Sequence, residues 1–98
     1  MKPKSQIYAE AIKTWGEEAQ MLMAVEEMSE LQKAILKYLR CLNFGRGDLE
    51  SCVNALIEET ADVEITLEQL KMIFSCSTRV EEAKAQKLSR LEMRLEES

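Results

Sequence analysis

Residues 17–42 read EEAQMLMAVEEMSELQKAILKYLRCL. Apolar side chains recur in this segment at alternating intervals of three and four residues, which is the spacing of one face of an α-helix. They are Met21, Ala24, Met28, Leu31, Ile35, Tyr38 and Leu42. The segment therefore predicts a long helix whose apolar seam faces a partner helix.

The partner helix is expected directly after a short loop. Asn43-Phe44-Gly45-Arg46-Gly47-Asp48 is the strongest loop signal in the interior, and Asp48 is suited to cap the following helix. Residues 49–74 repeat the seam with Val53, Leu56, Thr60, Val63, Leu67, Leu70 and Phe74. Ile57 and Ile65 lie outside this seam, and a helix that is apolar on more than one side must be covered on more than one side. In so small a chain, a second subunit is the expected cover.

Two shorter helices complete the predicted fold. Ser5 can cap a first helix that runs to Trp15 and is broken by Gly16. The segment Thr78-Arg79-Val80-Glu81 matches a capping box, which predicts a last helix running to about Glu96. With three glycines and one proline in 98 residues, the chain lacks the turn residues of a many-stranded sheet. The sequence predicts an all-α fold: one domain, residues 1–98, forming a small four-helix antiparallel bundle that assembles as a dimer or a dimer of dimers.

Composition excludes several classes of function. The chain has no histidine, which removes histidine-dependent catalysis and His-ligated metal sites. A formal net charge of -5 disfavours nucleic-acid binding, because no excess of basic charge is available to replace phosphate counterions. Three cysteines without CxxC spacing suggest neither a disulfide framework nor a thiolate metal site. Uncharged runs do not exceed seven residues, as at 19–25 and 51–57, so we expect a cytoplasmic protein without a membrane span.

The chemistry of the chain is concentrated in two similar acidic segments, Glu26-Glu27-Met28-Ser29-Glu30-Leu31 and Glu58-Glu59-Thr60-Ala61-Asp62-Val63. In a heptad with Met28 and Thr60 at position a, the first motif places Glu27 at g and Glu30 at c, and the second places Glu59 and Asp62 likewise. Both positions project from one edge of the apolar seam. If the two helices pack antiparallel, four carboxylates converge beside the core, and a hard divalent cation with oxygen ligands would neutralise them.

The alternative interpretation of these acids is a solvated helix face. A single EExxE motif is weak evidence in a glutamate-rich chain, and exposed like-charge pairs on a helix cost only about 0.2 to 0.5 kcal/mol. The second copy, in the same register of the seam and with one of the few aspartates, favours the metal site.

The acidic motifs also carry a family resemblance. EExxE followed on the next helix by ExxD resembles the signature of the all-α nucleoside triphosphate pyrophosphohydrolases, the MazG-type enzymes, which are related to the dimeric dUTPases and dCTPases. The flanking Trp15-Gly16, Leu31-x-Lys33-Ala34 and Lys87-Leu88-Ser89-Arg90 also look like compact MazG-type proteins, including phage-encoded ones. The resemblance implies that Glu27, Glu30, Glu59 and Asp62 hold Mg²⁺, for which Mn²⁺ can substitute. It also implies a homo-oligomer, and Glu26 as a ligand or a water-orienting neighbour.

Enzymes of this type hydrolyse a nucleoside triphosphate between the α and β phosphates, which gives a monophosphate and pyrophosphate. An acidic protein can hold the anionic triphosphate only through the cation. A spare carboxylate, either Glu26 or Glu30, would accept the proton of the attacking water, and the sequence leaves this choice open.

Basic residues should complete a phosphate site. Lys87 and Arg90 lie three residues apart on one face of the last helix and match a Lys-x-x-Arg element of MazG-type domains. The alternative is that they only interact with the helix dipole and with neighbouring glutamates. Lys37, seven residues beyond Glu30 on the same edge, could reach the substrate or pair with acids. Trp15 could stack on a base, although a Trp at the end of an amphipathic helix is more often part of the core.

The leading hypothesis is thus a Mg²⁺-dependent nucleoside triphosphate pyrophosphatase. The alternatives are a non-catalytic acidic helical bundle that engages or regulates a partner, and a nucleotide or metal sensor without turnover. The sequence does not define the base and sugar preference, the number of metal ions, the choice between dimer and tetramer, or the physiological role.

Overall fold

The computed structural model describes all 98 residues and consists of four α-helices. They are α1 (Lys4–Trp15), α2 (Glu17–Phe44), α3 (Leu49–Ile73) and α4 (Ser77–Glu97). The predicted all-α helical bundle is confirmed, and each predicted helix end lies within two residues of the observed one. None of these helices has the uninterrupted apolar stretch that crossing a bilayer requires.

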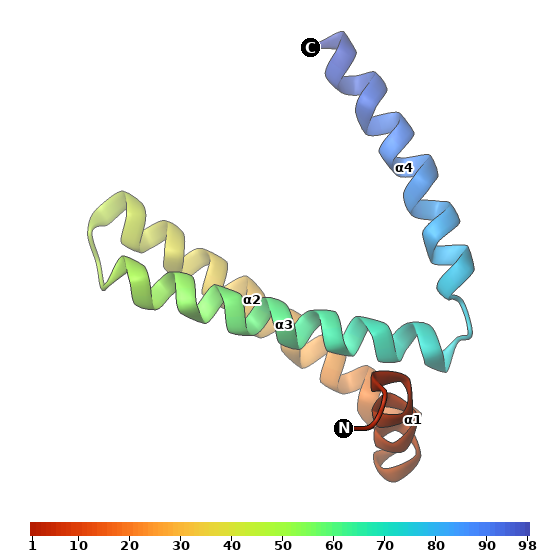
Figure 1. Cartoon of the computed structure of the whole chain (residues 1–98). Helices are drawn as coiled ribbons and strands as arrows, with labels where there is room; N and C mark the ends of the chain where they lie inside the picture. The colour runs from red at the N-terminus through yellow and green to blue at the C-terminus, as the bar shows by residue number, and fades with distance from the viewer.

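The centre of the fold is an antiparallel hairpin of α2 and α3 (Figure 1). Gly45, at φ 62°, ends α2 in the left-handed conformation, and its N–H donates to the carbonyl of Cys41. At the start of α3, the carboxylate of Asp48 accepts hydrogen bonds from the backbone N–H of Ser51 at 3.2 Å and from its hydroxyl at 2.7 Å. The prediction that Asp48 caps this helix is therefore confirmed.

The other two predicted caps are wrong. Helix α1 begins directly after Pro3, whose fixed φ of -59° suits a helix start, so Ser5 already lies inside the first turn. Helix α4 begins at Ser77 after Cys76, and no side chain caps it. The chain turns at Ser75, which has a φ of 49°, and the N–H of Cys76 bonds back to Lys71. Because this turn ends at Cys76, α4 begins at Ser77, and Thr78 lies in the first turn of the helix and does not precede it.

The outer helices pack differently. Helix α1 crosses the open end of the hairpin, where the hydroxyl of Tyr8 donates to Glu68 of α3 and the ammonium of Lys4 pairs with the same carboxylate at 3.4 Å. Helix α4 touches the rest of the chain only near its own start, where Val80 and Lys84 lie over the last turns of α3. Beyond that junction α4 projects away from the other three helices (Figure 1).

The contact between α2 and α3 is shifted by about one residue from the predicted seam. Its buried residues are Gln20, Ala24, Ala34 and Cys41 on α2, and Cys52, Val63, Thr66 and Gln69 on α3. Predicted seam residues Met28, Ile35 and Leu42 are instead 37%, 42% and 54% exposed. The small side chains of Ala and Cys allow the helices to approach closely along this line. The buried amides of Gln20 and Gln69 bond to each other at 2.6 Å across it.

Candidate metal centre

Three carboxylates converge in the middle of the hairpin. Glu27 comes from α2, and Glu59 and Asp62 come from successive turns of α3. Each offers an oxygen, and these oxygens all lie within 4.8 Å of one another. Three of the four carboxylates that the paired motifs were expected to bring together are thus adjacent. The antiparallel packing of α2 and α3 produces this meeting, because the two motifs lie at matching heights on the two helices.

The one-residue shift of the seam places two of these acids inside the helix contact. Glu27 and Glu59 are both half-buried, whereas Asp62 is exposed at the edge. The Oε2 atom of Glu59 is buried and has no hydrogen-bond partner. A buried carboxylate oxygen without a partner costs free energy, because it has lost its water without gaining a donor. The site therefore contains an acceptor that a cation would satisfy.

The pKa of Glu27 also reflects the close approach of these acidic groups. Its pKa is raised above the ordinary value of 4.5, first by loss of hydration and then by the negative charges of Asp62, Glu59 and Glu26. The raised pKa shows that the negative charge of Glu27 is disfavoured in the metal-free cluster.

The donor set fits a hard divalent cation. All three groups are carboxylates, with no nitrogen or sulfur among them, which is the ligand type that Mg²⁺ and Mn²⁺ prefer. Oxygens bound to one Mg²⁺ lie about 2.0 to 2.1 Å from the ion, so two of them can be separated by at most about 4.2 Å, whereas Ca²⁺, with bonds of up to about 2.6 Å, allows about 5.2 Å. The three carboxylate oxygens lie within 4.8 Å of one another, which is inside the Ca²⁺ limit, and Mg²⁺ would draw them closer by up to about 0.6 Å.

The remaining acids of the first motif lie outside the trio. Glu30 is exposed on the next turn of α2 and forms an ion pair with Lys33 at 3.4 Å. Glu26 is also exposed, and it is close enough to contribute to the raised pKa of Glu27. Neither carboxylate is buried, so both remain accessible to solvent water beside the cluster.

The predicted phosphate- and base-binding residues are not gathered around the carboxylates of the same chain. Lys37 is exposed on α2, about 10 Å along the helix from Glu30 at 1.5 Å per residue. Lys87 and Arg90 are exposed on α4, which projects away from the hairpin (Figure 1). Trp15 is 66% exposed at the end of α1, so within one chain it is not part of the core. Their substrate roles stay predictions.

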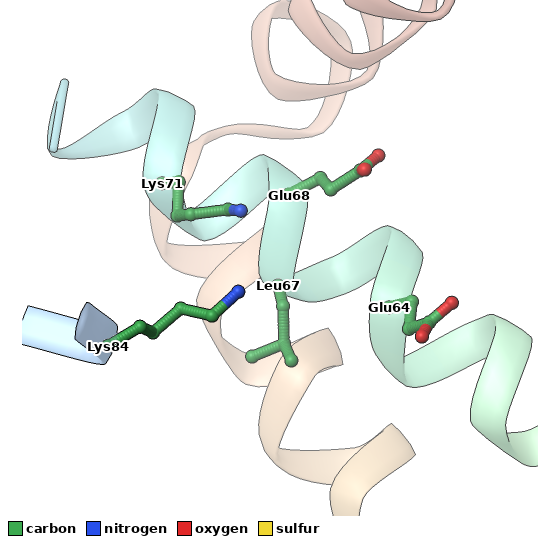
Figure 2. A pocket seen from close by; sticks show the side chains of 5 residues that line it. All are labelled: Glu64, Leu67, Glu68, Lys71 and Lys84. Atoms are coloured by element: carbon green, nitrogen blue, oxygen red, sulfur yellow. The ribbon is translucent and has the colours of Figure 1, made fainter. Parts of the chain in front are cut away.

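A feature that the sequence did not suggest is an open hollow of about 330 Å³ at the junction of α3 and α4. It is lined by Glu64, Leu67, Glu68, Lys71 and Lys84 (Figure 2). Lys84 extends from α4 towards α3 in this view. The hollow mixes two ammonium groups with two carboxylates, and Glu68 already binds Tyr8 and Lys4. Its existence depends on the angle of the turn at Ser75, for which the sequence carries no clear signal.

Comparisons with protein-family models, with curated proteins and with solved structures find no match to this chain. The carboxylate cluster and the resemblance of its motifs are therefore the features that indicate a function.

Proposed function

We propose that this protein is a Mg²⁺-dependent nucleoside triphosphate pyrophosphohydrolase that converts a ribo- or deoxyribonucleoside triphosphate to the monophosphate and pyrophosphate. One observation carries the proposal: Glu27, Glu59 and Asp62 bring oxygens within 4.8 Å, and one oxygen of Glu59 is buried without a partner. Several classes of enzyme use acidic metal sites. The order of the motifs in this chain, EExxE and then ExxD on the next helix, favours this class of hydrolase.

The acidic residues would hold the cation or accept a proton, and Glu30 is a candidate for both roles. Glu27, Glu59 and Asp62 would hold the cation, with Glu30 reaching it once its exposed ion pair with Lys33 is released. Bound Mg²⁺ would neutralise the cluster and stabilise negative charge on the phosphate oxygens. Hydrolysis consumes one water and releases a proton, which Glu26 or Glu30 would accept because both carboxylates are exposed beside the trio.

Basic side chains would hold the far end of the triphosphate. Lys37 follows Glu30 along α2 and is the candidate on the hairpin itself. Lys87 and Arg90 would have to reach the carboxylates from the α4 of another chain or after a movement of their own α4. The first of these routes would make the protein a homo-oligomer, either a dimer or a tetramer.

The direct test is a pyrophosphate-release screen over canonical and modified NTPs and dNTPs, with Mg²⁺ and with Mn²⁺. The expected products are equal amounts of monophosphate and pyrophosphate, and Glu59→Gln should lower turnover by at least 100-fold. Glu58→Gln is the matched control, because Glu58 is the adjacent residue, is exposed and lies outside the trio. Release of diphosphate and phosphate, or equal activity of both variants, would contradict the proposal.

The alternative is a non-catalytic bundle that engages a partner through its apolar surface. The observation that favours it is the number of large apolar side chains left exposed, among them Leu36, Ile57 and Leu91. A protein of this kind would show no saturable stabilisation by Mg²⁺ or Mn²⁺, and Glu59→Gln would leave its behaviour intact. A sensor would bind Mg²⁺ but release no pyrophosphate from any triphosphate.

A further inference from the structure

A second hollow, of about 390 Å³, adjoins the one shown in Figure 2 at the junction of α3 and α4. The two hollows share Leu67, Lys71 and Lys84, so they form one continuous depression, which we call the junction site. Its apolar lining consists of Leu67, Leu70, Phe74, Cys76 and Val80. Sites for small molecules typically have volumes of about 300 to 1,000 Å³. The junction site is therefore large enough for a small ligand with an apolar body.

Two ammonium groups border this apolar lining without a firm partner. Lys71 is half-buried near the end of α3 and forms no ion pair. Lys84 pairs with Glu81 of its own helix at 3.5 Å, and this pair contributes little because both side chains are well exposed to water. The ends of both lysines point into the space beside Leu67 (Figure 2). Like charges that share a space repel each other, so an anion placed there would remove this repulsion and gain two charged contacts.

Two carboxylates limit the charge that the junction site can accept. Glu64 and Glu68 line the hollow of Figure 2, where both side chains point away from the two lysines. Glu68 is already bound by Tyr8 and Lys4. Glu64 forms no ion pair, so its charge would repel a multiply charged group nearby. A ligand with a single negative charge, such as a carboxylate, therefore fits better than a phosphate ester, which carries up to two.

The junction site is separate from the carboxylate trio. Lys71 lies nine residues after Asp62, which places the two side chains on opposite sides of α3 and about 13.5 Å apart along its axis. The two sites have no residue in common. A small ligand in the junction site would therefore not contact a cation held by the trio.

We propose that the junction site binds a small amphipathic carboxylate, a molecule with an apolar chain and one carboxylate group. The chain lies against Leu67, Phe74 and Val80, and the carboxylate lies between Lys71 and Lys84. Burial of the chain supplies affinity, and the two ammonium groups select for the charged end. The inference does not rest on the proposed hydrolase activity.

Binding at this place has a structural consequence for α4. This helix touches the rest of the chain only near its own start, where it meets the last turns of α3. A ligand that contacts both helices adds to this small junction. The bound carboxylate therefore restricts the direction in which α4 projects.

The test is a calorimetric titration of the full-length protein with octanoate. The wild type should bind octanoate saturably, with one molecule per chain. Acetate lacks the apolar chain and octan-1-ol lacks the charge, so each should bind at least tenfold more weakly. Lys71→Gln and Lys84→Gln should each weaken octanoate binding at least fivefold. Arg79→Gln is the matched control, because it removes one positive charge from an exposed position of α4 that does not line the junction site.

A second measurement locates the ligand. In amide NMR spectra of the wild type, octanoate should shift signals in residues 64–84 and leave those of the carboxylate trio unchanged. Absence of saturable binding overturns the proposal. It is also overturned if octan-1-ol binds as tightly as octanoate, if Lys84→Gln and Arg79→Gln bind octanoate equally, or if the shifted signals centre on the α2–α3 hairpin away from α4.

Discussion

Glu59→Gln should change the stability of the metal-free and the Mg²⁺-loaded protein in opposite directions. The substitution keeps the size of the side chain and removes one negative charge from the trio. Two unit charges 4.8 Å apart repel by about 0.9 kcal/mol in water and by about 3.5 kcal/mol at an effective dielectric constant of 20. Because Asp62 is exposed, its repulsion with Glu59 should lie near the lower value, about 1 kcal/mol.

The predicted shifts are large enough to measure. For a domain of this size, 1 kcal/mol moves the melting temperature by about 4 to 8 °C, so Glu59→Gln should melt several degrees higher than the wild type in EDTA. A ligand at 100 times its dissociation constant stabilises the folded state by about 2.7 kcal/mol. Saturating Mg²⁺ should therefore raise the melting temperature of the wild type by about 10 to 20 °C and leave that of Glu59→Gln nearly unchanged.

The assay is thermal unfolding followed by circular dichroism, at one fixed protein concentration, over a titration of Mg²⁺. Glu58→Gln is the control and should retain the full Mg²⁺-dependent shift, since Glu58 is exposed and outside the trio. A variant Glu59→Gln that melts below the wild type in EDTA would show that the carboxylate stabilises the apo fold. A saturable Mg²⁺ shift in that variant would show that the ion binds elsewhere. Either result would refute the reasoning.

Three further predictions concern pH and local structure. Because the pKa of Glu27 is raised above 4.5, the metal-free protein should gain stability as the pH falls through that raised pKa towards 4.5; Glu27→Gln should lack this gain in pH-dependent melts. Asp48→Ala should lower the melting temperature by about 4 to 8 °C by removing the cap on Ser51, and Glu50→Ala should not. Tyr8→Phe should cost about 1 kcal/mol in urea unfolding, because Glu68 loses a donor, and an unchanged midpoint would contradict that bond.

The number, order and approximate ends of the helices followed from periodicity, from the loop at 43–48, from the break at Gly16 and from the segment at 78–81. For α2 and α3, the alternation of apolar residues in 17–42 and 49–74 and the glycine-rich turn between them were sufficient, because local sequence dictates where a helix can and cannot continue. Asp48 was recognisable as a cap for the same reason. The starts of α1 and α4 were harder to place, since both are set by the turn before them and not by a capping side chain.

The pattern of apolar residues did not predict which residues of α2 and α3 lie in the contact between the two helices. Both helices are apolar over a wide arc of their surface, so more than one line of residues within that arc could face the partner helix. The small residues Ala24, Ala34 and Cys41 select that line by allowing the closest approach. As a result, Glu27 and Glu59 lie within the contact between α2 and α3, although the sequence predicted them at its edge.

The convergence of the carboxylates was predictable, and the completeness of the site was not. Glu27, Glu59 and Asp62 meet because two similar motifs lie at the same height of an antiparallel pair. The position of Lys87 and Arg90 depends on the direction of α4, which one turn at Ser75 determines. Periodicity carries no information about that direction.

Anomalous diffraction from crystals grown with Mn²⁺ tests the central claim most directly. We expect a peak between the carboxylates of Glu27, Glu59 and Asp62, within coordination distance of all three and absent from crystals of Glu59→Gln. Crystals in which these side chains point apart into solvent, with no peak between them, would contradict the proposed metal centre.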